Sequence, residues 1–144
     1  MTTITHDLGH GMGNDWEYKD WAHLTVSELH NLQPYYPCLQ GNIQILWCSP
    51  RPFSSAAVIE VTQDAASTDK IGSRSYFIKR SHRSFRNAQD ILQEHAFLRH
   101  LASKNIPVAT LIASNCGLTA LEMGDWTYEV YEKAAGFDLY VDQQ

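Results

Sequence analysis

The chain has 144 residues, which suits one domain, and its apolar content of 44% is enough to bury a core. With 16 acidic against 11 basic residues, the formal charge of -5 disfavours a general role on nucleic acid or on an anionic membrane. The three cysteines are widely spaced, and no apolar run resembles a signal peptide or a membrane span. We therefore expect a cytoplasmic protein with no membrane partner, in which any anion site is local.

The first 15 residues carry three glycines and no apolar periodicity, so residues 1–15 are expected to form a mobile tail before a domain over residues 16–144. His6 and His10 would share one face of a helix there. The glycines disfavour that helix, and a solvated tail is the better interpretation.

The first predicted helix covers residues 26–32. Thr25 and Glu28 have the spacing of a capping box, in which the hydroxyl and the carboxylate each satisfy a free amide at the helix start. Pro34 ends the helix.

Two β-prone runs, residues 43–48 and 56–61, flank Pro50-Arg51-Pro52 and predict a hairpin with a wide turn. The predicted turn continues through Ser54 and Ser55, whose hydroxyls and amides are able to face a phosphate. It contains no glycine and matches no phosphate-loop motif, so this signal is weak by itself.

A third strand is predicted at residues 74–80. Alternation along it places Phe77 and Lys79 on one face, with Tyr76, Ile78 and Arg80 on the other. One face therefore carries a lone ammonium group beside an aromatic ring. The basic connector that follows, residues 81–86, is best interpreted as a solvated charged face, and RNA contact is the less favoured alternative.

Residues 87–104 have the strongest helical pattern, with the stop signals Asn105 and Pro107 after them. On the helical wheel Glu94 lies at the flank of the apolar stripe, and His95 lies nearer its middle. We interpret His95 as a hydrogen-bonded core histidine, because the sequence places no nucleophile or acid beside it.

Three more strands are predicted at residues 108–113, 118–122 and 126–133, and the last is followed by the small residues Ala134-Ala135-Gly136. The turn sequences between them favour antiparallel neighbours. The predicted fold class is α+β: a mostly antiparallel sheet of five to six strands, with one main helix packed on it and a short N-terminal helix.

In this order and spacing, the chain over residues 25–140 resembles the N-terminal lobe of the aminoglycoside phosphotransferase and choline-kinase-like family of small-molecule kinases. The resemblance rests on Phe77-Ile78-Lys79, on Glu94 within residues 93–101, on residues 105–108, and on residues 128–132 with 136–140 after them. Each motif is only moderately specific by itself, and their common order is more so.

The resemblance implies ATP with Mg as cofactor. In that family Lys79 would contact the phosphates, Glu94 would position Lys79, and the turn at Ser54 and Ser55 would cover the phosphates. The backbone of Glu132, Lys133 and Ala134 would receive adenine. The alternative is that Lys79 and Glu94 form a structural ion pair, or that Lys79 merely snorkels to the surface and Glu94 is an exposed acid.

The sequence has no H-x-D-x-x-x-x-N motif, which the family carries in a C-terminal catalytic lobe. We therefore expect an ATP-binding lobe that is truncated and not catalytic alone, with a C-terminal lobe or a second copy as possible partner. The alternative is a non-catalytic protein-interaction or dimerisation module derived from such a lobe. The sequence names no acceptor substrate.

Overall fold

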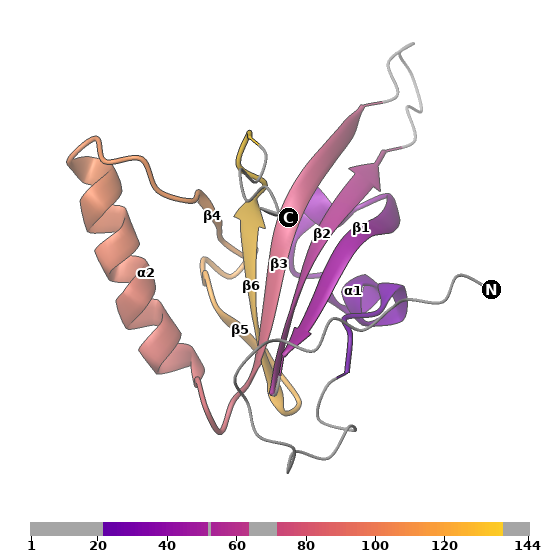
Figure 1. The fold of residues 1–144 in the computed structure, drawn as a ribbon, viewed down its shortest axis with the longest axis horizontal. Helices are drawn as coiled ribbons and strands as arrows, with labels where there is room; N and C mark the ends of the chain where they lie inside the picture. Colours follow the sequence, from indigo (N-terminus) through magenta and orange to yellow (C-terminus); the bar gives the residue numbers. More distant parts are fainter. Residues whose placement is uncertain (1–21, 52, 64–71, 137–144) are drawn as a thin grey trace, which may run out of the picture.

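A computed structural model describes residues 22–51, 53–63 and 72–136, so the predicted tail at residues 1–15 lies outside the described residues. Figure 1 shows the helices and strands in chain order. They are α1 (Val26–Leu32), the 3-10 turn η2 (Pro37–Leu39), β1 (Asn42–Arg51), β2 (Ser54–Thr62), β3 (Ser73–His82), α2 (Ala88–Ser103), β4 (Leu111–Ile112), β5 (Leu121–Met123) and β6 (Trp126–Glu132). None of the helices in these described ranges is both long and apolar enough to span a bilayer.

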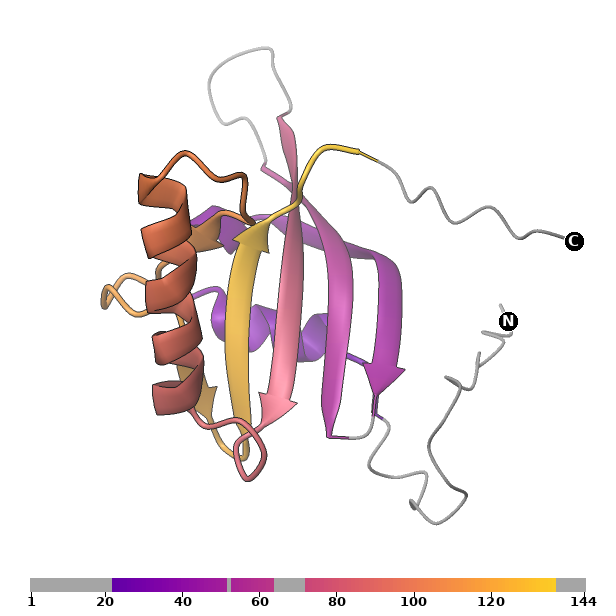
Figure 2. The ribbon, with the colours of Figure 1, turned by 60° about the vertical axis from the view of Figure 1, so that its left-hand side comes forward.

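The six strands form one sheet with the order β1-β2-β3-β6-β4, and β5 pairs with β6 beyond the end of β4. All of these pairings are antiparallel. The two helices lie on opposite sides of the sheet, α1 on one face and α2 near the other (Figures 1 and 2). The predicted α+β fold, with an antiparallel sheet, one main helix and a short N-terminal helix, is confirmed.

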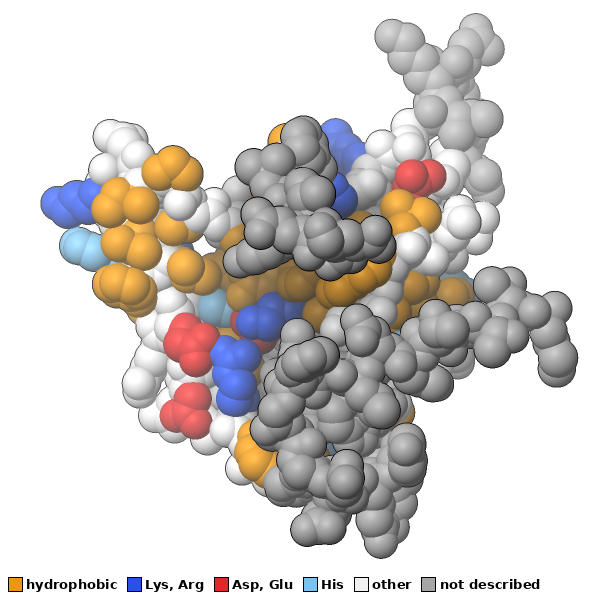
Figure 3. Space-filling model, viewed as in Figure 1, with side chains coloured by type: hydrophobic (Ala, Val, Ile, Leu, Met, Phe, Trp, Pro, Cys, Tyr) orange, Lys and Arg blue, Asp and Glu red, His pale blue; other side chains and the backbone are white. Residues whose placement is uncertain are grey.

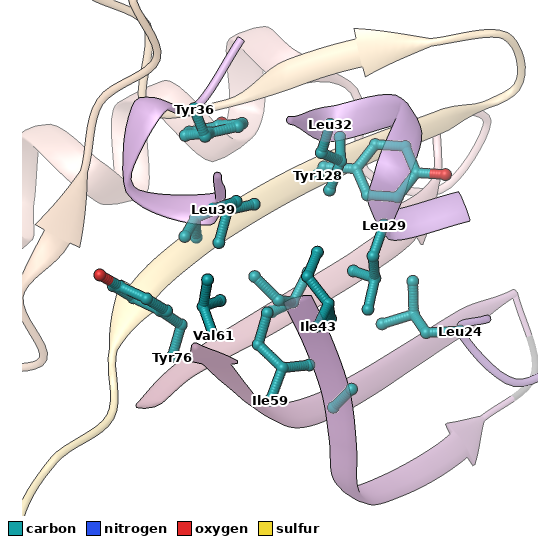
Figure 4. Close-up of a cluster of buried hydrophobic side chains, with 13 residues drawn as sticks. Leu24, Leu29, Leu32, Tyr36, Leu39, Ile43, Ile59, Val61, Tyr76 and Tyr128 are labelled. Carbon is teal, nitrogen blue, oxygen red and sulfur yellow. The ribbon is translucent and has the colours of Figure 1, made fainter. Parts of the chain in front are cut away.

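The hydrophobic core lies between the sheet and the N-terminal segment. Leu29, Leu32 and Leu39 from α1 and η2 are fully buried against Ile59 and Ile78 of the sheet (Figure 4). Each such side chain contributes about 1.5–3 kcal/mol when it leaves water. This face of the sheet is therefore occupied by core packing, which leaves the face toward α2 as the one open to a ligand.

A partly buried ion pair fastens α1 to the sheet. The Thr25 hydroxyl accepts a bond from the Glu28 amide at 3.2 Å, as the capping box predicts. The Glu28 carboxylate does not return to the helix start, because it accepts two bonds from Arg80 Nη1 at 2.7 and 2.8 Å and one from the Tyr128 hydroxyl at 2.5 Å. The predicted capping box is thus only half formed.

The predicted wide turn between β1 and β2 is wrong. The ladder continues through Pro50 and Arg51, and Arg51 is the register partner of Ser54. β1 pairs with β2 alone in the described sheet, and an edge strand of this kind tolerates a residue without an amide proton. Ser54 and Ser55 are consequently the first residues of β2 instead of a covering turn.

The predicted helix over residues 87–104 corresponds to α2, which begins with the Asn87 side chain accepting a bond from the Asp90 amide at 3.0 Å. Only Ile91 and His95 of this helix are buried. Its C-terminal half is more open to solvent, and Phe97 is 62% exposed. Helix α2 therefore contacts the sheet mainly through its first half.

The last strands are shorter than predicted. β4 and β5 both pair with β6, one after the other along the same edge, instead of with each other. A tight turn at Gly124, where φ is 58°, joins β5 to β6. This arrangement makes β6 an inner strand, so that its side chains toward α2 lie in the middle of the sheet.

Candidate functional site

Lys79 lies in the middle of the sheet face that is turned toward α2. Its direct partners in register are Ala56 on β2 and Glu129 on β6. Lys79 Nζ lies 3.9 Å from Glu129 Oε2, and the lysine side chain is 37% exposed. The predicted alternation of β3 is confirmed, since Tyr76, Ile78 and Arg80 are buried on the opposite face.

Glu129 is the centre of a buried polar cluster. The carboxylate is 1% exposed, and its Oε1 accepts a bond from the Tyr131 hydroxyl at 2.6 Å and one from His95 Nε2 at 2.8 Å. His95 Nδ1 lies 2.8 Å from the Thr119 hydroxyl. Both ring nitrogens of this buried histidine therefore have a polar partner. The prediction that His95 is a hydrogen-bonded core histidine is confirmed.

The surroundings keep Glu129 ionised. Burial alone would raise the pKa of this carboxyl, but the hydrogen bond from Tyr131, the charge of Lys79, the bond from His95 and the charge of Arg86 outweigh burial and lower the pKa. Burial and the bond to Glu129 raise the pKa of Tyr131, so its hydroxyl remains a donor. Glu129 is therefore a fixed negative charge beside Lys79.

Glu94 does not meet Lys79 in this structure. Its side chain is 58% exposed and binds Arg86 Nη2 instead. Neighbouring residues on an α-helix point about 100° apart, and here the inward direction belongs to His95. The expected carboxylate partner of Lys79 is thus replaced by Glu129, a residue that the sequence reasoning missed. Its signal was present, because Glu129 is a charged residue inside an apolar strand, as Lys79 is.

A cavity of about 480 Å³ opens beside Lys79, within the size range of small-molecule sites. Figure 3 shows the hydrophobic hollow between α2 and the sheet, with basic and acidic side chains together at its lower end. The structure brings Lys79 together here with all three residues predicted to receive adenine. The lining residues are Val58, Phe77, Lys79, Leu98, Ala109, Tyr131, Glu132, Lys133 and Ala134.

The three residues predicted at adenine differ in their free backbone groups. The Glu132 amide donates to the Thr110 carbonyl at 2.9 Å, and the Lys133 amide donates to the Ser75 carbonyl at 3.2 Å. The Ala134 amide makes no bond to the described residues. Of the three, Ala134 is therefore the one whose amide is available to a ligand.

A second cavity of about 360 Å³ adjoins Lys79 on the side of the β1–β2 hairpin, and Ser54, Ser81 and Arg86 also line it. The structure thus brings Ser54 and Ser55, which also lines this cavity, near Lys79. The Ser55 hydroxyl is committed elsewhere, since it accepts from the Leu24 amide at 3.2 Å and lies 3.4 Å from the Ser49 carbonyl. With Ser55 only 3% exposed, its hydroxyl is not placed to cover a phosphate.

The sheet has the architecture of the N-terminal lobe of a kinase-like phosphotransferase, with a lysine on its third strand and a cavity that reaches the end of its last strand. The chain matches the sequence model of the phosphotransferase enzyme family (APH) over residues 58–144, more than half of its length, and it belongs to this family. A search of curated proteins found no match.

The fold is also similar to a solved structure, amicoumacin kinase hAmiN in complex with AMP-PNP, Ca²⁺ and Ami. The two chains are 25% identical with a TM-score of 0.55, over 75% of this chain and 30% of the kinase. The chain thus spans less than a third of the length of that kinase. The predicted resemblance to the N-terminal lobe of an aminoglycoside phosphotransferase-like kinase is confirmed.

Proposed function

We propose that this chain is the ATP-binding N-terminal lobe of a small-molecule phosphotransferase. The observation that carries the proposal is that Lys79 lines two adjoining cavities. One cavity reaches the predicted adenine-binding residues 132–134, and the other contains Ser54 and Arg86. A nucleotide laid across both would place its base in the first and its phosphates in the second.

The lining of the larger cavity suits a purine. Phe77 and Tyr131 line it with their ring centroids 6.4 Å apart, and Trp47 of the smaller cavity stacks with Phe77 at 6.4 Å. Aromatic and aliphatic side chains give a flat base apolar contact, and the Ala134 amide adds one directional hydrogen bond. Lys79 then supplies the charge that distinguishes a nucleotide from a nucleoside.

The described residues contain no group of three or more His, Cys, Asp or Glu side chains able to hold a metal. They do not fit a resident metal site. Mg would therefore enter on the phosphates of ATP, and we assign no residue of this lobe to it. Transfer to an acceptor hydroxyl would need residues that the family carries in its second lobe.

The three free thiols of Cys38, Cys48 and Cys116 support the expected cytoplasmic location.

Isothermal titration of Mg-ATP into the chain tests the proposal. Binding should be measurable at millimolar nucleotide and should be lost or reduced about tenfold or more in Lys79→Met, because a charged hydrogen bond contributes about 1.5–3 kcal/mol. Lys104→Met removes an exposed lysine outside both cavities and should leave binding unchanged. The absence of heat at millimolar Mg-ATP, or equal binding by Lys79→Met, would refute the proposal.

The alternative function is a non-catalytic interaction or dimerisation module. Exposed Phe97, Ile106 and Leu118, at 62%, 47% and 44%, lie on α2 and on the segments after it, and this observation favours a protein partner. Sedimentation velocity over a range of concentrations would detect a second copy. A dimer without ATP binding would favour this alternative.

A further inference from the structure

Arg86 and Lys79 share one carboxylate oxygen. Arg86 Nη1 lies 3.7 Å from Glu129 Oε2, and Lys79 Nζ lies 3.9 Å from the same atom. Both cations line the 360 Å³ cavity together with Ser54 and Ser81. Two positive side chains from different elements therefore converge on one small cavity beside the proposed base site.

Neither cation is saturated by Glu129. The Oε2 atom is buried without a hydrogen-bond partner, because both contacts to it are longer than a hydrogen bond. Lys79 and Arg86 therefore retain N–H donors for another anion. Glu129 sets the positions of both cations and leaves their donors available.

Arg86 has a second counter-ion, Glu94, which is exposed to solvent. Glu94 binds Arg86 Nη2 and is 58% exposed, so its carboxylate can return to water at small cost. With Glu94 displaced, two positive charges face the one negative charge of Glu129. The cavity then carries a net positive charge, which suits a polyphosphate.

The backbone around Arg86 is tied to the hairpin that carries Ser54. The His82 amide donates to the Phe53 carbonyl at 2.7 Å, and the Arg86 amide donates to the His82 carbonyl at 3.2 Å. The rings of Phe53 and Phe85 stack with centroids 4.4 Å apart. These contacts fix Arg86 relative to the hairpin before any ligand binds, which lowers the entropy cost of binding.

We infer that Arg86 is a second phosphate-binding cation of this lobe, placed beside Lys79 by Glu129 and occupied at rest by Glu94, which the phosphates of a nucleoside di- or triphosphate displace. The inference rests on the proposed nucleotide binding and extends it to a residue and a displacement step. It also reverses the expected role of Glu94, which becomes a competitor of the ligand instead of a support for Lys79.

The first test titrates inorganic tripolyphosphate and ATP separately into the wild-type chain and into Arg86→Gln. Both ligands should bind Arg86→Gln about tenfold more weakly or worse, since one charged contact is lost. Arg86→Lys keeps the charge and should keep most of the affinity. Arg83→Gln is the matched control, because Arg83 lies in the same connector and pairs with Glu122 instead of facing the cavity.

The second test uses Glu94→Gln, which should bind tripolyphosphate more tightly because it removes the carboxylate that competes for Arg86. The gain should be only about two- to fivefold, because a solvent-screened surface ion pair is weak. Glu122→Gln removes one negative charge near the same connector and should change the affinity less. Weaker binding by Glu94→Gln, or unchanged binding by Arg86→Gln, would overturn the inference while ATP binding by the wild type stands. If tripolyphosphate binding depends on Arg86 but ATP binds no more tightly than tripolyphosphate, the adenosine part contributes nothing. That result would uphold the inference and refute the nucleotide proposal. A wild-type chain that binds neither ligand would refute both.

Discussion

Lys79 and Glu129 are direct register partners on adjacent antiparallel strands, with Nζ and Oε2 3.9 Å apart. The ladder between β3 and β6 therefore sets this pair, and a displacement of α2 would not separate it. Glu94 is on α2, where its distance from Lys79 depends on the position and rotation of the helix. The lysine of this lobe thus has a partner fixed by the sheet itself.

A double-mutant cycle distinguishes the two carboxylates. The coupling free energy between Lys79→Met and Glu129→Gln in urea unfolding should be about 0.5–1 kcal/mol, because the pair is only partly exposed but longer than a hydrogen bond. The coupling between Lys79→Met and Glu94→Gln should be near zero. The reverse order of the two coupling energies would show that Glu94 is the true partner.

The stability of the protein should depend on the ionisation of Glu129. Its pKa in the folded chain is lowered from 4.5, so its contribution is fully present above that pH and is lost as the pH falls through the folded pKa. The difference in unfolding free energy between the wild type and Glu129→Gln should therefore be constant near neutral pH and should shrink below pH 4.5. Urea unfolding across this range measures it, and a difference that grows on acidification would contradict the assignment.

The ion pair that attaches α1 to the sheet should contribute to stability, so loss of Arg80 should lower the free energy of unfolding. This guanidinium is 3% exposed, is bound to Glu28 and lies 4.0 Å from the ring centroid of Trp126. Arg80→Met should reduce the unfolding free energy by about 3 kcal/mol, because it leaves the Glu28 carboxylate with the Tyr128 hydroxyl but without a positive charge beside it. Adding Glu28→Gln should recover part of the loss. Arg99→Met, an exposed site on α2, should change stability by less than about 0.5 kcal/mol.

The base and phosphate parts of the site should be separable. Ala109 is exposed on the wall of the 480 Å³ cavity, next to Thr110, whose carbonyl accepts from the Glu132 amide. Ala109→Trp should fill this cavity and weaken ATP binding, while the affinity for tripolyphosphate at Lys79 stays unchanged. Calorimetry with both ligands checks this, and equal loss for both would mean that the two cavities do not divide the nucleotide as proposed.

Much of the fold could be predicted from local patterns. The helix at residues 26–32, the face alternation around Lys79 and the inward position of His95 follow from periodicity, and the structure confirms them. These features depend on residues close in the sequence, where a period of 2 or 3.6 fixes the direction of each side chain.

The predictions that the structure contradicts depend on how segments far apart in the sequence are placed relative to one another. A wheel places Glu94 at the edge of a stripe, but only the docking of α2 decides whether Glu94 or His95 faces the sheet. The pairing of Lys79 with Glu129 spans 50 positions of sequence and requires the register of β3 against β6. Ser55 likewise became a core-facing residue because the ladder of β1 continues past Pro50.

Chemical-shift mapping of backbone amides with AMP-PNP tests the central claim, that this lobe binds a nucleotide across Lys79 with its phosphates at Arg86. The largest changes should occur at residues 77–79, 86 and 132–134, and the change at Ala134 should disappear with tripolyphosphate. Changes confined to residues 105–107, 117 and 119, which line a neighbouring groove and neither proposed cavity, or no change at saturating nucleotide, would contradict the claim.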